Sequence, residues 1–162
     1  MLLVCLGLGD MLQKPKLTPF CELRVELAQP KVMGTGRAGE RRIIPIIGGT
    51  VTGQVEGNIL NLGADWQTVF ADGSADLDTR YAFETRDHAL IEIINKGIRH
   101  GPPEVIAALA RGEDVDPSSY YMRTTARLET GDERYRWVNR MIFLGTGTRQ
   151  AAQVHIQLYS VE

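Results

Sequence analysis

The sequence predicts a mostly β protein, an antiparallel closed β-barrel of about eight or nine strands with one short helix. Apolar and polar residues alternate with a period of two in several runs, as they do in half-buried strands. Glycines and turn-forming pairs separate these runs at short intervals, which is typical of successive hairpins. The chain lacks the regular alternation of strands and helices that characterises a doubly wound sheet. Closure into a barrel removes the free edges that a meander of strands would expose.

The first half of the chain is expected to supply five strands, over residues 18–27, 41–47, 56–62, 64–70 and 75–85. The first alternates Cys21, Leu23 and Val25 with polar residues. The second is rich in β-branched isoleucine, and its Pro45 indicates an edge or a bulge. Glycines bend the chain before the third strand, and the turn Ala71-Asp72-Gly73 closes the fourth.

The second half continues with a hairpin partner for the fifth strand, over residues 89–99. The pattern then changes, since Pro102-Pro103-Glu104 is a typical helix start and Gly112 a typical stop. We therefore expect a short helix over residues 105–111. Three more strands are expected over residues 120–129, 135–144 and 153–161.

A chain of 162 residues suggests one domain. We expect residues 18–162 to form the barrel and residues 1–17 to be a disordered N-terminal extension. Residues 1–9 are apolar but lack the basic segment of a secretory signal, and Asp10 interrupts them. No run approaches the roughly 20 apolar residues that span a membrane. The expectation is a soluble, cytoplasmic protein without a membrane partner.

Charge and residue usage argue against several ligand classes. The formal net charge of −2, without a dense basic run, argues against nucleic acid as a partner. The two cysteines, Cys5 and Cys21, form no CxxC pair, and no two His or Cys residues have metal-ligand spacing. Gly145-Thr146-Gly147 lacks the third glycine of a dinucleotide-binding motif. We therefore expect neither a metal nor a cofactor.

Five ordered segments of the chain resemble a single family. They are residues 41–50 (RRIIPIIGGT), 63–67 (GADWQ), 77–81 (LDTRY), 99–105 (RHGPPEV) and 116–124 (DPSSYYMRT). Together they are similar to the bacterial and fungal family known as domain of unknown function 3237, over roughly residues 18–161. The chain departs from the family pattern at Ile47 and at 61–63, which concerns loop geometry. The resemblance implies a compact barrel of calycin-like shape with a central cavity, and no established reaction.

The strand expected over residues 120–129 carries the strongest candidates. Side chains alternate between the two faces of a strand, so Tyr121 and Arg123 project together. Glu129 shares their row but lies eight residues beyond Tyr121, more than about 20 Å further along the extended strand. On the outside of a barrel this row would be an ordinary polar surface. The cavity implied by the resemblance favours the other orientation, with Tyr121 and Arg123 facing the lumen.

Other candidates have both a functional and a structural interpretation. Asp65 and Trp66 would place a carboxylate and an apolar wall at a pocket rim, or else cap a turn and fill the core. Arg80 would bind an anion in the lumen or form a solvent ion pair. Trp137 and Asn139 share one face of the expected strand 135–144, where an isolated Asn needs a hydrogen bond from the protein or from a ligand.

The leading functional hypothesis is that the barrel binds a small anionic or hydroxylated aromatic molecule in its lumen. Arg80 and Arg123 would anchor negative charge, Trp66 and Trp137 would stack, Asn139 would hydrogen-bond, and Tyr121 or Asp65 would transfer a proton. For an enzyme, these groups fit isomerisation, lyase chemistry or hydration without a cofactor. Two alternatives stay open: a carrier that uses the same pocket without catalysis, and an interaction barrel whose apolar outer face forms a homodimer.

Overall fold

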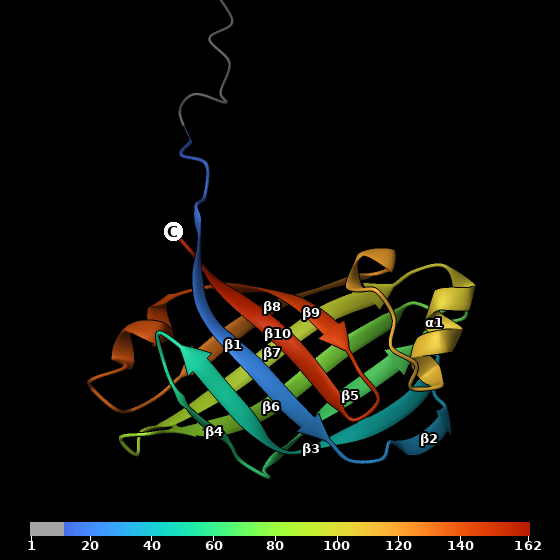
Figure 1. Ribbon diagram of the computed structural model, residues 1–162, viewed down its shortest axis with the longest axis horizontal. Helices are drawn as coiled ribbons and strands as arrows, with labels where there is room; N and C mark the ends of the chain where they lie inside the picture. The colour runs from blue at the N-terminus through green and yellow to red at the C-terminus, as the bar shows by residue number, and fades with distance from the viewer. Residues whose placement is uncertain (1–11) are drawn as a thin grey trace, which may run out of the picture.

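The computed structural model describes residues 12–162 and shows a closed antiparallel barrel of eight strands, with two further strands and one α-helix (Figure 1). The fold class predicted from the sequence is confirmed. Most of the predicted N-terminal extension, residues 1–11, lies outside the described residues. The strands are β1 (Leu17–Leu27), β2 (Lys31–Thr35), β3 (Glu40–Gly53), β4 (Gly57–Ile59), β5 (Gly63–Val69), β6 (Ala75–Thr85), β7 (Leu90–His100), β8 (Tyr121–Glu129), β9 (Phe143–Arg149) and β10 (Gln153–Val161).

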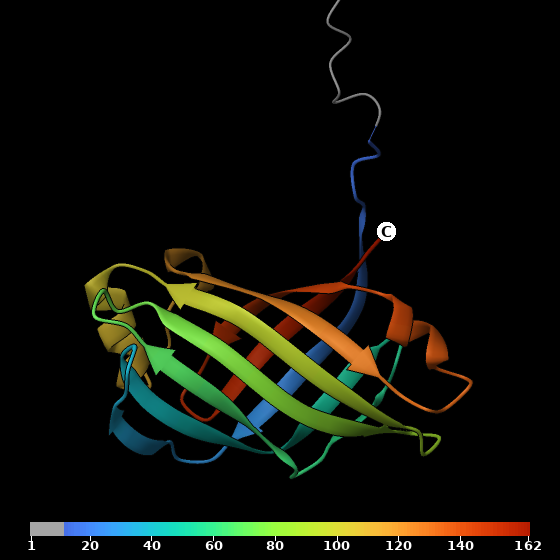
Figure 2. The same cartoon turned by 180° about the vertical axis from the view of Figure 1, so that it is seen from behind.

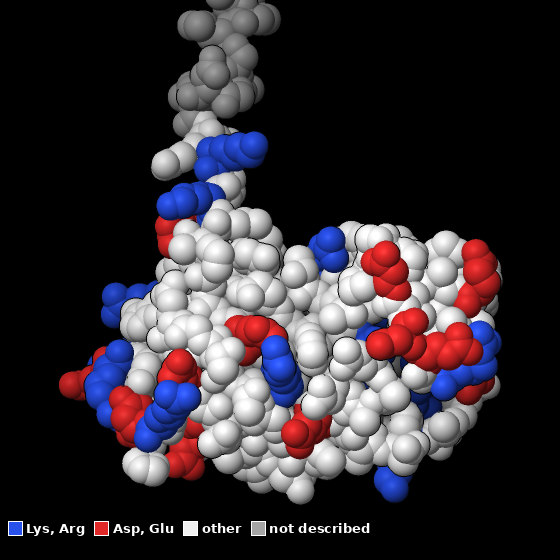
Figure 3. All heavy atoms as spheres, viewed as in Figure 1, with Lys and Arg blue, Asp and Glu red and all other residues white. Residues whose placement is uncertain are grey.

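The ring of the barrel follows the order β1-β10-β9-β8-β7-β6-β5-β3, and β3 closes it by pairing with β1. Every pairing is antiparallel. Strand β4 extends the ring next to β5 by bridging β3 and β6, and β2 adds to the outer part of β3. Figures 1 and 2 show the two opposite sides of this ring, with β5 to β8 in front in Figure 2. Acidic and basic side chains are interspersed over the face seen in Figure 3.

Short helices lie at the two ends of the barrel. Helix α1 (Pro103–Ala110) starts at a proline, and its buried Leu109 packs in one cluster with Leu77, Tyr120 and Met122. A 3-10 helix, Arg136–Arg140, lies at the opposite end (Figure 1). The two ends are therefore covered by different segments, and the end under α1 is the one that holds polar groups.

The interior is filled by large apolar side chains toward the 3-10 helix. The rings of Phe20 and Phe143 lie 4.7 Å apart, and Trp137 meets Phe20 edge-on at 5.5 Å. Phe83 and Leu128 are buried in the same cluster. This packing leaves no wide central channel at that end.

The expected strand over residues 135–144 is wrong in its first part, which forms the 3-10 helix. Strand β9 instead runs from Phe143 to Arg149. The physical reason is local: the Asn139 side chain accepts a hydrogen bond from the backbone N–H of Thr130 and donates one to its carbonyl oxygen, each 2.9 Å long. These two bonds fold the segment back against the end of β8 and give Asn139 a structural role.

Candidate functional site

The prediction that Tyr121 and Arg123 face the lumen is wrong. Exposure alternates without a break along β8, and Met122 and Thr124 are the buried neighbours. Tyr121 is 45% exposed and stacks on the ring of His100 at 4.9 Å. The Arg123 guanidinium lies 5.2 Å from the Tyr121 ring centroid, also on the outside. The other row faces the interior, where Met122, Ala126 and Leu128 pack in the apolar core.

Arg80 also points outward, which corrects its predicted lumen position. It forms an exposed ion pair with Glu92 at 3.5 Å. Trp66 is 46% exposed on the outer face of β5, and Trp137 is 42% exposed at the far end of the barrel. Asp65 is the one sequence-predicted candidate whose side chain lies in the interior, because it precedes Trp66 on a strand and so points the opposite way.

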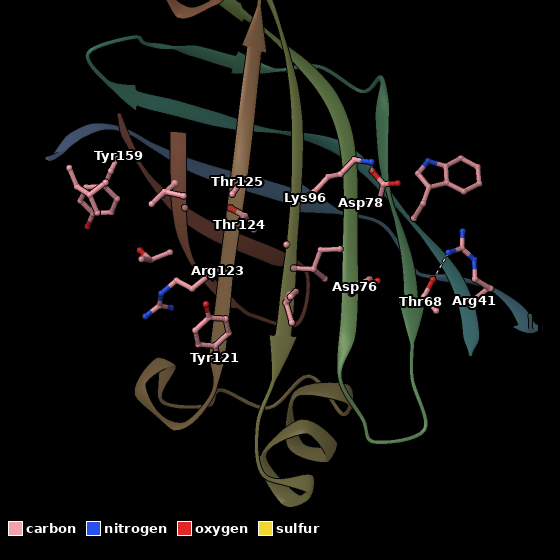
Figure 4. Close-up of a pocket in the computed structure, with 18 residues that line it drawn as sticks. Arg41, Thr68, Asp76, Asp78, Lys96, Tyr121, Arg123, Thr124, Thr125 and Tyr159 are labelled. Atoms are coloured by element: carbon pink, nitrogen blue, oxygen red, sulfur yellow. Dashed lines mark hydrogen bonds and ion pairs between the residues drawn. The ribbon is translucent and has the colours of Figure 1, made fainter. Parts of the chain in front are cut away.

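Three of the predicted residues meet outside the barrel instead. Trp66, Tyr121 and Arg123 line an open groove of about 940 Å³ that crosses the outer side of the barrel from Arg41 of β3, over β5 to β9, to Tyr159 of β10. Figure 4 shows Tyr121 and Arg123 projecting from β8, with Tyr159 beyond them on one side and Arg41 on the opposite side of the groove. The groove is shallow and mostly apolar in lining, which is the character of a contact surface more than of an enclosed small-molecule site.

The Asp65 carboxylate is held in a fixed orientation inside the barrel. Its Oδ2 accepts a hydrogen bond from Gln67 Nε2 at 2.6 Å, and its Oδ1 accepts one from the backbone N–H of Asp78 at 3.0 Å. Gln67 in turn accepts a hydrogen bond from Arg42 Nε at 2.8 Å. Burial raises the pKa of Asp65 above its ordinary value, although these hydrogen bonds and the charges of Arg99 and Arg149 act in the opposite direction.

Three arginines converge beside Asp65 at the α1 end. Arg42 comes from β3, Arg99 from β7 and Arg149 from β9, and all three line one cavity of about 70 Å³ that Leu109 and Ala110 of α1 help to close. Arg99 is 7% exposed. Burial, and then repulsion from the other two guanidinium groups, lowers the pKa of Arg99 to about 10, so it stays charged at neutral pH.

A second cavity, of about 30 Å³, lies deeper in the lumen and shares Arg149 with the first. It has room for about one water molecule. Asp65, Tyr81, Asn95 and Thr124 contribute to its wall. The Tyr81 hydroxyl, both side-chain polar atoms of Asn95 and the Thr124 hydroxyl are buried without a hydrogen-bond partner in the protein. Such groups are rare in folded proteins, so this concentration of them distinguishes the α1 end of the lumen.

Arg42, Arg99 and Arg149 were not among the site residues predicted from the sequence. One signal was available: Arg99 has the same parity along its strand as Ile91 and Ile93 and therefore points inward with them. The same argument applies to Arg42 relative to Ile44 and Ile46. Nothing in the sequence indicated that β3, β7 and β9 would bring their arginines together, because that depends on the register of the closed barrel.

The described residues offer little for a metal ion. Within residues 12–162, no group of three His, Cys, Asp or Glu side chains is placed to share one. The same part of the chain contains no helix with the length and apolar character needed to cross a bilayer.

The fold and site together define a closed antiparallel β-barrel with an arginine-rich polar compartment at one end. The model of a family described as "Protein of unknown function (DUF3237)" matches residues 15–161, and the chain belongs to this family. The chain is 51% identical to a UPF0311 protein of Bradyrhizobium diazoefficiens over 123 residues, which are 76% of this chain and 81% of that protein. A UPF0311 protein of Clostridium acetobutylicum is 41% identical over 124 residues, 76% of this chain and 78% of that one.

Solved structures agree with the fold. A conserved protein of unknown function from Rhodopseudomonas palustris superposes with a TM-score of 0.88 at 37% identity, over 94% of this chain and all of that one. A beta-barrel like protein from Acinetobacter baumannii gives a TM-score of 0.82 at 43% identity, covering 93% and 98%. A structure described as an enzyme from Penicillium herquei superposes with a TM-score of 0.70 at 18% identity, over 93% of this chain and 96% of that one. At this identity the likeness concerns the fold alone.

Proposed function

We propose that this protein binds a small hydroxylated or anionic organic molecule in the α1 end of its lumen and transfers a proton to or from it through Asp65. The observation that carries the proposal is the group of buried, unpartnered polar atoms on Tyr81, Asn95 and Thr124 around the same cavity as Asp65. A hydroxyl or carbonyl group of a ligand would supply the hydrogen bonds that these atoms lack.

The position of Asp65 suits a general base. Its raised pKa makes the carboxylate a stronger proton acceptor than one in water. Gln67 and the Asp78 N–H fix both of its oxygens, so little reorganisation is needed before the proton moves. In a substrate with a C–H bond next to a carbonyl, the proton would pass to Asp65 and the electron pair would move to the carbonyl oxygen. Arg149, which lines the same cavity, would stabilise that developing negative charge.

A likeness to a structure described as an enzyme is compatible with catalysis but carries no reaction across at 18% identity. The three alternatives of isomerisation, lyase chemistry and hydration share the same first step, removal or addition of a proton by one positioned group. The proposal is therefore stated at the level of that step.

Solvent exchange tests the step directly. The protein is incubated in D₂O with a panel of small hydroxy and keto acids, and loss of each C–H signal is followed by proton NMR. We expect catalysed exchange of at least one compound, and Asp65→Asn should slow it by about 10²-fold or more. Asp78→Asn is the matched control, because the Asp78 side chain lies outside the barrel and pairs with Lys96 at 3.5 Å. Equal exchange rates for Asp65→Asn and wild type would refute the role of Asp65, and ligand binding without any exchange would indicate a carrier.

A second function, self-association, is favoured by one row of residues on the outer groove. Asp76, Ile98 and Arg123 lie side by side on β6, β7 and β8. Ile98 is 50% exposed, and neither charged residue has an ion-pair partner within residues 12–162. A two-fold axis along β7 would place Ile98 against its copy and Arg123 of one molecule opposite Asp76 of the other. We propose a second copy of the chain as the occupant of this face.

Charge reversal tests that arrangement by light scattering after gel filtration. Wild type should run as a dimer, and Asp76→Arg or Arg123→Asp alone should shift it to monomer through like-charge repulsion. The double variant restores opposite charges and should restore the dimer. Arg80→Asp, on the outer face away from this row, is the control. A wild-type protein that remains monomeric at high concentration would disprove the proposal.

A further inference from the structure

The cationic cluster at the α1 end is not neutralised by the protein. Within residues 12–162, Asp65 is the one carboxylate whose charge acts on Arg42, Arg99 and Arg149. Among the described residues, none of these arginines forms an ion pair with it or with another acid. Three positive charges therefore share one negative charge in a largely desolvated region. An unpaired buried charge is strongly unfavourable, so a built cluster of this kind indicates a binding site for an anion.

The donors of the cluster are also available. The Arg99 side chain is more than nine-tenths buried, and its Nε has no hydrogen-bond partner in the described part of the chain. Arg149 makes one long side-chain bond, 3.4 Å, to the carbonyl oxygen of Ala151. Arg42 donates its Nε–H to Gln67, which leaves its two terminal nitrogens available as donors. Surface arginines in the same protein behave differently: Arg134, for example, is paired with both Asp87 and Asp132.

The cavity between these side chains has the size of one small charged group. Its volume of about 70 Å³ exceeds the roughly 30 Å³ of a water molecule about twofold. Its remaining wall is apolar, from Pro30, Ile44, Leu109 and Ala110. Guanidinium groups donate pairs of parallel hydrogen bonds that match the spacing of carboxylate and phosphate oxygens.

We infer that Arg42, Arg99 and Arg149 form a binding site for one oxyanionic group, the carboxylate or phosphate of the molecule that enters the lumen. The inference deepens the proposed function, since it names the ligand class of the same compartment. It also explains the relation between the two cavities: the anion occupies the outer one, next to α1, and one small group of the molecule, about the size of a water, reaches past Arg149 toward Asp65 and Asn95.

Calorimetric titration with inorganic phosphate and, separately, acetate tests the site, with acetamide as the uncharged analogue of acetate. We expect wild type to bind at least one of the two anions and not acetamide. Arg99→Met and Arg149→Gln should each weaken that binding about tenfold or more, since each removes a charged donor. Arg80→Gln removes an exposed arginine and should leave the affinity unchanged. Circular dichroism checks that each variant folds. If Arg99→Met does not fold, Arg149→Gln tests the site alone, because Arg149 is only half-buried.

The outcomes separate this inference from the proposed proton transfer. Asp65→Asn should abolish exchange in D₂O but keep or tighten anion binding, because it removes the one competing negative charge. Absence of binding for both anions, or equal weakening by Arg80→Gln and Arg99→Met, would overturn the inference while leaving the exchange result intact. Preference for phosphate over acetate, or the reverse, assigns the group.

Discussion

Replacement of Arg99 by Met should stabilise the ligand-free protein. Burial and the neighbouring guanidinium groups lower the pKa of Arg99 to about 10, against an ordinary value of about 12.5. Each pKa unit corresponds to about 1.36 kcal/mol, so the charged form is disfavoured by about 3 kcal/mol in the fold. Met keeps most of the aliphatic stem of Arg99 in contact with its neighbours and removes the charge. The free energy of unfolding should therefore rise by about 1–3 kcal/mol.

Urea unfolding at pH 7, followed by tryptophan fluorescence, measures this difference. For a chain of this length, each kcal/mol gained in the free energy of unfolding raises Tm by roughly 2–4 °C. Arg80→Met, on the exposed surface, should stay within about 0.5 kcal/mol of wild type. Added phosphate or acetate, whichever binds, should stabilise wild type and reduce the gap, since a ligand stabilises the state that binds it. If Arg99→Met instead lowered the free energy of unfolding by about 1 kcal/mol or more, the charge of Arg99 would be well compensated in the fold and the reasoning would be refuted.

Three further substitutions test other parts of the structure. Burial raises the folded-state pKa of Asp65 above 3.8, so its stabilising contribution is complete below that pH and is lost as the pH rises through the folded-state pKa. Asp65→Asn should thus gain stability relative to wild type between about pH 4 and pH 7, and urea midpoints with no such trend would contradict this. Asn139→Ala leaves the Thr130 backbone groups unpaired and should cost about 1–3 kcal/mol in the same assay; a loss under about 0.5 would show that water replaces the side chain. At Gly49, with φ +131°, an added Cβ would overlap the carbonyl oxygen of Arg24 in β1. Gly49→Ala should therefore lower Tm far more than Gly73→Ala, where φ is also positive but no atom lies within 4 Å.

The sequence predicted the strands well because alternation and turn residues are local signals. The antiparallel barrel and the helix under the Pro102-Pro103 start follow from them, and α1 begins at Pro103 as that start requires. The alternating pattern failed over residues 135–140, where side-chain hydrogen bonds from Asn139 outweighed a short run of suitable residues. Local propensity does not report side-chain hydrogen bonds between residues nine positions apart.

The candidate site was predicted less well, because the two faces of a strand are equivalent in an alternating pattern. Alternation states which residues share a face, but it does not state which face is inside. The polar row of β8 was assigned to the lumen, whereas Met122, Thr124 and Ala126 occupy it. Asp65, predicted as a carboxylate at a pocket rim, lies in the interior, whereas its neighbour Trp66 lies on the outer face of the strand. The three arginines come from strands that are far apart in sequence, and only the closed register brings them together.

Because the strands pair in a fixed register around the closed barrel, the arginine compartment depends on the number of residues in each strand as well as on their identity. Arg99 points inward and Ile98 outward because of an even spacing from the buried Ile91 and Ile93. One residue inserted in β7 between them would exchange these roles, moving the guanidinium into solvent and the isoleucine into the cavity, with every side chain type conserved. Members of this family that tolerate length changes should therefore carry them in the turns, and a length change within β3, β7 or β9 would mark a relative with a different interior.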